Sequence, residues 1–321
     1  MRKGEKKVKK NFVTIVTALV LVLSLAGCSV TVNGPAAGQT QTTSGKDEAA
    51  SSEQAAETAE ADAPASEALQ KCELQVFIAA SLSKVMEEIA EKYNEREPGV
   101  NIVYNADSSG TLMTQIEEGY ACDVFFSAAQ KQMDTLEGEG FVVEGTRSDV
   151  VNNQVCVITL KDSGTKVTGL DNIGEATSIA LADGSVPVGR YTRQAMVNAG
   201  LLKEAEDASA ITTKEVSEQL GGVEISEQSN VSKVLAAVVE GSCEVGTTYY
   251  SDTYGYEDKI EILEMVPYEL SGNVIYPIAQ IENEEADEAE KAAALDFVRF
   301  VTSDEAKAVF EKYYFDTNVG N

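Results

Sequence analysis

The sequence predicts an α/β fold in which helices cover mostly parallel β-sheets. Short apolar runs alternate along the chain with stretches of helical periodicity, and several of these runs lead into serine, glycine or asparagine. Strands and helices that alternate in this way are typical of parallel sheets with helices on their faces. The segment from about Cys72 to Asn321 has roughly 250 residues, which is enough for two lobes or one large domain.

The N-terminus has the pattern of an export signal. A basic stretch at residues 1–10 leads into an apolar run from Phe12 to Ala26, which is followed by a glycine and then Cys28. This order is typical of a signal peptide over residues 1–27 that is cleaved before a lipidated cysteine. An uncleaved anchor and plain secretion are the alternatives. Because a diacylated cysteine holds a protein at a membrane, we expect an extracytoplasmic protein that is lipid-anchored to the cell membrane.

Residues 28–71 are expected to hold the lipidated Cys28 and a flexible acidic tether. This segment consists largely of Ala, Ser, Thr, Gln and Glu, with almost no aromatic or branched apolar residue. Such a composition cannot bury enough apolar surface to offset the entropy of ordering the chain. The folded part is therefore expected to begin near Cys72.

The charge of the chain restricts the partners that it can bind. The sequence has 53 Asp and Glu against 25 Lys and Arg, which is a formal net charge of −28. Such a surface repels DNA and RNA, so nucleic acid is excluded as a partner. An anionic ligand would have to be held by short-range hydrogen bonds from neutral groups. The acidity by itself is that expected of a protein that stays soluble outside a cell.

The cysteines do not indicate a metal site. The chain has no histidine and no Cys-x-x-Cys pair, so a Cys/His zinc site is excluded, and we expect neither a metal nor a cofactor. Cys122 and Cys156 lie in or beside apolar runs and are expected to be buried free thiols. A disulfide that involves Cys72 is the alternative outside a cell. The cysteines after Cys28 are Cys72, Cys122, Cys156 and Cys243.

The first predicted lobe comprises residues 72–152 together with residues 283–321. Its first apolar run ends at Ala80 and is followed at once by a helical stretch, with Ser81 placed as the N-cap. Two further pairs of strand and helix follow, and the C-terminal segment adds two helices. The predicted strands are residues 74–80, 100–104 and 124–126, and the predicted helices are residues 82–93, 112–117, 130–137, 282–301 and 304–313.

The second predicted lobe comprises residues 153–282. An apolar run at residues 155–160 marks its start, and further strands and helices alternate after it. The remaining predicted strands are residues 179–182 and 244–249, and the predicted helices are residues 190–199 and 231–239.

Neutral donors gather where the predicted strands end and the helices begin. Ligands of α/β sheets bind at the carboxyl ends of strands. The first N–H groups of a helix have no intrahelical partner and lie at the positive end of its dipole. The junctions are at residues 80–82, 108–111, 186–189 and 230–232, and the hydroxyl of Tyr249 lies at a further strand end. Together they predict an anion site without formal charge.

Each of these residues also has an ordinary structural explanation. Serine is a preferred N-cap, so Ser81 needs no ligand to account for it, and residues 108–110 have the composition of a plain loop. Tyr249 is explained as a half-buried packing residue. Val188 and Val231 are by composition core residues. Only the combination of all five positions favours a binding site.

The order of these motifs resembles that of the molybdate-binding proteins of ABC importers. The resemblance runs from about Leu74 to Phe315. Ala129 departs from it, since many members have Asp there, and so does Gly110, where a third hydroxyl residue is common. The resemblance is carried by Phe77-Ile78-Ala79-Ala80-Ser81-Leu82, Ser108-Ser109-Gly110-Thr111-Leu112, Asp123-Val124-Phe125-Phe126-Ser127-Ala128, Val186-Pro187-Val188-Gly189-Arg190-Tyr191, Asn230-Val231-Ser232 and Tyr249.

The resemblance implies a two-lobed type II periplasmic-binding fold that holds molybdate or tungstate in the cleft between the lobes. It also implies that two serines, two backbone N–H groups and a tyrosine hydroxyl hold the ligand. The partners that it implies are the oxyanion and the permease subunit of an ABC importer. We expect a monomer without enzymatic activity. The matching positions are Ser81, Ser109, Val188, Val231 and Tyr249.

Two other interpretations are open. A protein of the same fold that binds sulfate, phosphate, iron or an organic acid is the first, and Asp107 and Asp183 near the junctions are acceptors that phosphate would favour. A serine acyl enzyme is the second, because Ser81 and Lys84 match S-x-x-K, in which the lysine can act as base. No K-T-G motif follows, and a Ser-His-Asp mechanism is excluded without histidine.

Overall fold

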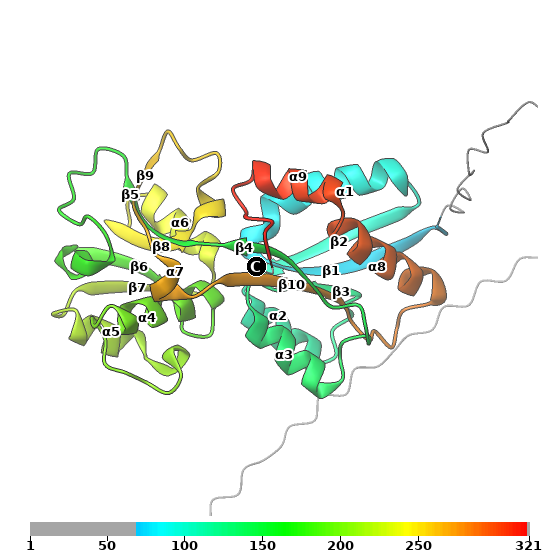
Figure 1. The fold of residues 1–321 in the computed structure, drawn as a ribbon, viewed down its shortest axis with the longest axis horizontal. Coiled ribbons are helices and arrows are strands. Elements are labelled where there is room, and N and C mark those ends of the chain that lie inside the picture. Colours follow the sequence, from blue (N-terminus) through cyan, green and yellow to red (C-terminus); the bar gives the residue numbers. More distant parts are fainter. Residues whose placement is uncertain (1–68, 320–321) are drawn as a thin grey trace, which may run out of the picture. The chain divides into compact units, whose positions relative to one another are not determined.

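The computed structural model describes residues 69–319, which form two five-stranded sheets with helices packed against them (Figure 1). The expectation of a two-lobed α/β fold is confirmed. The predicted signal peptide, the lipidation site Cys28 and nearly all of the predicted tether lie outside the described residues.

The first sheet has the strand order β2-β1-β3-β10-β4, where the strands are β1 (Cys72–Ala79), β2 (Val100–Asp107), β3 (Val124–Phe126), β4 (Ser148–Asn153) and β10 (Val274–Gln280). Side chains of β3 and of the C-terminal half of β1 are buried because helices cover the sheet. Those helices are α1 (Ser83–Arg96), α2 (Ser109–Glu117), α3 (Gln130–Glu139), α8 (Glu288–Val301) and α9 (Asp304–Lys312).

The second sheet has the strand order β7-β6-β8-β5-β9, where the strands are β5 (Val155–Leu160), β6 (Ser178–Ala182), β7 (Glu224–Gln228), β8 (Val245–Tyr249) and β9 (Ile260–Met265). β5 and β8 are almost wholly buried at its centre. The helices of this lobe are α4 (Pro187–Asn198), α5 (Thr213–Gln219), α6 (Val231–Val239) and α7 (Tyr268–Ser271), with short 3-10 turns η2 (Leu170–Glu175), η3 (Ala208–Ala210) and η4 (Tyr250–Thr253).

Each sheet is mixed, and not mostly parallel as the sequence suggests. In the first sheet β1 is parallel to β2 and β3, whereas β10 is antiparallel to β3 and β4. In the second sheet β6 is parallel to β7 and β8, whereas β5 is antiparallel to β8 and β9. A strand that is buried on both faces has the same apolar composition whichever way its neighbour runs, so its direction cannot be predicted from that composition.

Strand β10 belongs to the first sheet, although the sequence-based boundary places residues 153–282 in the second lobe. It pairs with β3 through Ile278 and Phe126 and with β4 through Tyr276 and Val151. The chain therefore passes between the sheets twice, from β4 to β5 and from β9 to β10 (Figure 1). Hydrophobic pattern predicts that a strand is buried, but it does not say which sheet the strand joins.

The helices at the junctions begin at residues whose side chains or backbone explain their starts. Ser108 caps α2 by accepting a hydrogen bond from Thr111 N–H, and Asn230 caps α6 by accepting one from Lys233 N–H. The prediction of Ser81 as an N-cap is wrong, because Ser81 lies in a 3-10 turn, η1 (Ala80–Leu82), and its side chain caps no helix. Its hydroxyl is left for another partner.

The described residues include no helix that is both long and apolar enough to span a membrane. Within residues 69–319, no group of three or more His, Cys, Asp or Glu side chains is placed to hold a metal ion. The prediction of buried free thiols at Cys122 and Cys156 is confirmed. Cys72 and Cys243 are free as well, so the alternative of a disulfide from Cys72 to one of the other three is not realised.

Candidate functional site

A small cavity lies where loops of the two sheets face each other, and all five positions named from the sequence line it. Its free volume is about 10 Å3, roughly the room for one water molecule and far below the roughly 300–1,000 Å3 of sites for organic ligands. Walls this close together leave no room for an organic ligand. The five lining positions are Ser81, Ser109, Val188, Val231 and Tyr249.

Ser109 offers its hydroxyl proton to the cavity. It is the first residue of α2 and is fully buried. Its Oγ accepts a hydrogen bond of 2.9 Å from the backbone N–H of Ala128. Because a hydroxyl has one proton and the Ala128 bond uses a lone pair, the proton of Ser109 remains free to donate to a ligand.

Val188 and Val231 face the cavity at the starts of two helices. Pro187 is the first residue of α4 and Val188 the second, while Val231 is the first residue of α6. N–H groups at these positions have no partner within the helix, and they point along the positive end of the helix dipole. The two valines therefore present free backbone N–H groups at the cavity, and their side chains pack in the core.

Gly189 lets the start of α4 approach the end of β6. A Cβ atom at this position would overlap the carbonyl oxygens of Asp183 and Ala182. A larger residue would push the start of α4, and with it the N–H of Val188, out of place. Gly189 thus has a steric reason to be glycine.

Tyr249 has a buried hydroxyl that is not hydrogen-bonded in the described part of the chain. It is the last residue of β8, its side chain is 1% exposed, and its ring lies 6.0 Å from that of Tyr276. Burial raises the pKa of Tyr249 well above its usual value, and nearby Tyr276 and Tyr191 raise it further, against a smaller lowering by Arg190. The hydroxyl therefore keeps its proton, and a buried donor of this kind needs an acceptor.

Arg193 holds the start of α4 in place on the second-lobe side of the site. No sequence motif indicated this role. Its guanidinium is fully buried and donates to the carbonyls of Ile211, Ala182 and Gly189 and to the hydroxyl of Thr213. These bonds tie the first turn of α4 to the end of β6. Buried arginine in an amphipathic helix is hard to foresee, because arginine is almost never fully buried.

Contacts between the lobes surround the cavity. Asn230 Nδ2 donates to Asp107 Oδ1 at 3.1 Å, and Ser232 Oγ donates to the carbonyl of Ala80 at 3.4 Å. Farther out, Lys131 pairs with Asp207 at 2.7 Å. The lobes are thus held in a closed arrangement.

The two carboxylates that phosphate would favour are engaged elsewhere. Asp107 Oδ1 accepts from Asn230 and also from the backbone N–H of Ser108. Asp183 Oδ1 accepts from the backbone and the hydroxyl of Ser185, and these bonds lower the pKa of Asp183. Neither carboxylate lines the cavity. The polar side chains of the lining are therefore hydroxyls, those of Ser81, Ser108, Ser109 and Tyr249.

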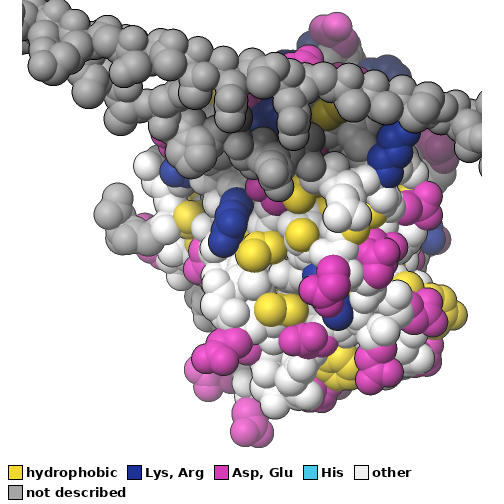
Figure 2. Space-filling model, turned by 90° about the vertical axis from the view of Figure 1, so that its right-hand side faces the viewer, with side chains coloured by type: hydrophobic (Ala, Val, Ile, Leu, Met, Phe, Trp, Pro, Cys, Tyr) yellow, Lys and Arg dark blue, Asp and Glu magenta, His cyan; other side chains and the backbone are white. Residues whose placement is uncertain are grey.

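The charge of the chain as a whole gives little long-range attraction for an anion. Asp and Glu side chains spread over the face shown in Figure 2, with fewer Lys and Arg side chains between them. The net charge of the chain is −28. Recognition of an anion must therefore rest on the buried donors, whose hydrogen bonds are strengthened by the low dielectric of the interior.

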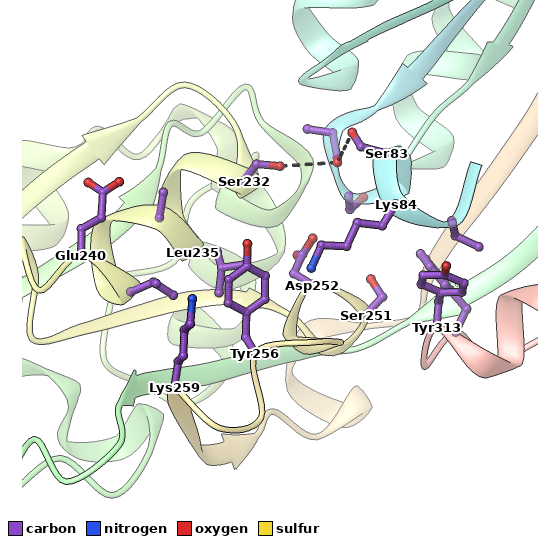
Figure 3. A pocket seen from close by; sticks show the side chains of 16 residues that line it. Ser83, Lys84, Ser232, Leu235, Glu240, Ser251, Asp252, Tyr256, Lys259 and Tyr313 are labelled. Carbon is purple, nitrogen blue, oxygen red and sulfur yellow. Dashed lines mark hydrogen bonds between the residues drawn. The ribbon is translucent and has the colours of Figure 1, made fainter. Parts of the chain in front are cut away.

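A larger pocket of about 320 Å3, shown in Figure 3, adjoins the site. Ala80 and Ser81 line both the pocket and the cavity. Lys84 points into this pocket, where its ammonium donates to the carbonyl of Tyr254 at 2.8 Å and lies 4.0 Å from the centre of the Tyr256 ring. The hydroxyl of Ser81 bonds instead to Tyr276 at 2.9 Å. Lys84 is therefore engaged away from Ser81, and the geometry does not support a serine acyl enzyme.

Comparison with known proteins identifies the class. The chain belongs to the bacterial extracellular solute-binding proteins, because the sequence model of that family matches residues 74–316. The solved structure of the periplasmic molybdate-binding protein of Azotobacter vinelandii aligns with a TM-score of 0.61 at 20% identity, over 75% of this chain and 98% of that one. The two-lobed periplasmic-binding fold that the resemblance implies is thereby confirmed.

Two relatives narrow the comparison. The molybdate-binding protein ModA of Escherichia coli is 30% identical over 249 residues, which cover 75% of this chain and 88% of that protein. The lipoprotein YvgL of Bacillus subtilis is 28% identical over 246 residues, which cover 76% of this chain and 86% of that protein. The chain is thus similar to its relatives over nearly the whole described part.

Proposed function

We propose that this protein is the substrate-binding subunit of an ABC importer and that its ligand is molybdate or tungstate. Membership of the solute-binding family supports the class, and the similarity to Escherichia coli ModA supports the ligand. The protein holds the oxyanion between its closed lobes without changing it chemically. The closed form is then the one that a membrane permease recognises.

The observation that carries the proposal is the convergence of neutral donors on one small buried cavity. Ser81, Ser109 and Tyr249 contribute hydroxyls, and Val188 and Val231 contribute backbone N–H groups. The Tyr249 hydroxyl is buried without a partner among the described residues. A tetrahedral oxyanion supplies acceptors on all sides, so it satisfies donors that come from several directions at once.

Selection among oxyanions follows from the fixed positions of the donors. Sulfate has shorter bonds than molybdate, so it cannot reach all of the donors at the same time. Each buried donor that stays unpaired costs about 1–3 kcal/mol. Molybdate and tungstate have nearly the same size and are expected to bind with similar affinity.

Isothermal titration calorimetry of the purified full-length protein with molybdate, tungstate, sulfate and phosphate tests the proposal. Molybdate and tungstate should bind, and sulfate and phosphate should bind at least about tenfold more weakly, because one unpaired donor already accounts for that factor. Tight binding of sulfate, or no binding of molybdate, would contradict the assignment.

A pair of serine variants separates the site from general effects of losing a hydroxyl. Ser109→Ala removes a donor from the cavity and should weaken molybdate binding by roughly tenfold or more. Ser303 is the N-cap of α9, and its Oγ accepts a hydrogen bond from the N–H of Ala306 outside the cavity. Ser303→Ala should therefore leave the molybdate affinity unchanged. Equal affinities of the two variants would remove Ser109 from the site.

We also propose that Cys28 carries the lipid anchor and that the protein acts as a monomer outside the cytoplasm. The lipoprotein relative YvgL supports the anchor. Cys28→Ala should abolish incorporation of labelled palmitate and release the protein from membranes. Continued membrane attachment of that variant, or a stable dimer in sedimentation, would contradict the respective proposal.

A further inference from the structure

A chain of three buried polar side chains lies behind the cavity. Tyr276 OH is 2.9 Å from Ser81 Oγ and accepts a hydrogen bond of 3.1 Å from Asn153 Nδ2. Asn153 Nδ2 also donates to Ser251 Oγ at 2.8 Å. Tyr276 and Asn153 are at most 2% exposed, so water cannot replace these bonds. Both residues lie in the strands where the chain passes between the lobes.

The orientation of the Asn153 amide determines the direction of this chain. Its oxygen accepts from the backbone N–H of Gln154 at 2.9 Å, so its nitrogen faces Tyr276 and Ser251. An amide nitrogen only donates, and therefore Tyr276 OH must accept from it. The one proton of Tyr276 then has Ser81 Oγ as its acceptor. A Tyr276 proton directed elsewhere would be a buried unpaired donor, which is unfavourable.

We propose that Asn153 and Tyr276 are positioning residues that force Ser81 to act as a donor toward the ligand, and that this makes the site selective for oxyanions that carry no proton. The inference rests on the proposed function of the cavity. Once Tyr276 donates to Ser81, the proton of Ser81 can only point to the ligand. At Ser109 the backbone N–H of Ala128 has the same effect. At Ser81, by contrast, the side chains of Tyr276 and Asn153 set the direction of the hydroxyl proton, so that direction can be changed by mutation.

The consequence is rejection of protonated oxyanions. Hydrogen phosphate and hydrogen arsenate carry an O–H at neutral and mildly alkaline pH, and this group needs an acceptor in a dry site. In this cavity Ser81, Ser109 and Tyr249 all donate, and the remaining hydroxyl of the lining, that of Ser108, is already bonded to the backbone N–H and the hydroxyl of Thr111. Molybdate, tungstate and sulfate are fully deprotonated and meet only donors. Exclusion of phosphate thus has a different cause from exclusion of sulfate, which depends on size.

Asn153→Asp reverses the chain with almost no change of shape. An ionised carboxylate only accepts, so the proton of Tyr276 turns to the carboxylate introduced at position 153 and the tyrosine oxygen accepts from Ser81. Ser81 then faces the cavity with a lone pair. At pH 8, calorimetry should show molybdate affinity lowered by roughly tenfold or more and phosphate affinity raised by about tenfold. The proposal would be overturned by a folded Asn153→Asp protein that still binds molybdate and prefers it to phosphate as strongly as the wild type does.

Two further variants separate the direction of the hydrogen bonds from charge and folding. Asn152→Asp adds the same charge one residue away, but Asn152 Nδ2 bonds to Asn273 and not to Tyr276. An effect of charge alone should weaken the binding of molybdate and the binding of phosphate together. Tyr276→Phe removes the chain without adding charge and should weaken molybdate binding without any gain for phosphate. If Tyr276→Phe binds molybdate as tightly as the wild type, Tyr276 does not position Ser81. If the wild type itself binds no molybdate, the proposed function fails first and the inference with it.

Discussion

Replacing Tyr249 with phenylalanine removes one hydroxyl from the wall of the cavity and leaves the aromatic ring in place. The ring packs against Tyr276, with centroids 6.0 Å apart, so the core around it is retained. The hydroxyl itself is buried and not hydrogen-bonded to any described residue. Ligand affinity and protein stability are therefore expected to change in opposite directions.

The magnitudes follow from the two environments of this hydroxyl. With an oxyanion bound, it makes a hydrogen bond to a charged acceptor, which contributes about 1.5–3 kcal/mol, so Tyr249→Phe should weaken binding by roughly 10-fold to 150-fold. In the closed protein without ligand, an unpaired buried hydroxyl is destabilising by about 1–3 kcal/mol. The variant should therefore be at least as stable as the wild type in the absence of ligand.

Thermal unfolding and calorimetry, each with and without molybdate, measure both effects. Without ligand the unfolding temperature of Tyr249→Phe should be unchanged or higher, and the stabilisation by molybdate should be smaller than in the wild type. Tyr93→Phe is the matched control, because the Tyr93 hydroxyl donates to Asp296 Oδ2 at 3.0 Å in the first lobe, away from the cavity. It should lose stability and keep its affinity. A Tyr249→Phe protein that binds like the wild type, or that is destabilised like the control, would refute the reasoning.

Three other changes test the structure around the site. Gly189→Ala places a Cβ against the carbonyls of Asp183 and Ala182. It should lower the free energy of unfolding, measured by urea denaturation, by about 1–3 kcal/mol and weaken ligand binding, measured by calorimetry. Wild-type values for both would contradict the close packing. Lys131→Ala removes an exposed ion pair between the lobes. It should weaken ligand binding by no more than about fivefold, and the difference from the wild type should disappear at high salt. A larger or salt-independent effect would contradict the view that this ion pair is a weak surface contact. Burial raises the pKa of Asp252 to about 6, above its value in the unfolded chain. Its contribution to stability is therefore complete below about pH 4 and is lost as the pH rises through 6. Asp252→Asn should match the wild type in urea denaturation at pH 4 and be more stable by roughly 2–3 kcal/mol at pH 8, and parallel pH profiles of the two proteins would exclude this role.

Local sequence signals predicted the elements that carry most of the candidate site. The apolar run before Ser81 and the helical periodicity after it correspond to β1 and α1, and Asn230 stands at the start of α6. Helix α4 begins at Pro187, three residues before the predicted helix of residues 190–199. These signals depend on neighbours a few residues away, because helix caps and hydrophobic periodicity are local properties of the chain. The partly exposed strands β7 and β9 and the short helix α5 lack a strong apolar pattern and were not predicted. Strands β4 and β10 and helix α7 were not predicted either, although β10 is almost wholly buried.

The sequence by itself determined the alternation of strands and helices and the acidity of the chain. Its resemblance to the molybdate-binding proteins indicated the five positions that line one cavity. Only the tertiary structure decided that β10 joins the first sheet and carries Tyr276 to Ser81, that Asn153 sets the direction of their hydrogen bonds, and that Arg193 ties α4 to β6. Asn153 and Tyr276 are 123 residues apart in the chain. The physical reason is that a buried polar side chain must find its partner wherever the packing of distant strands places one, and no local pattern encodes that partner.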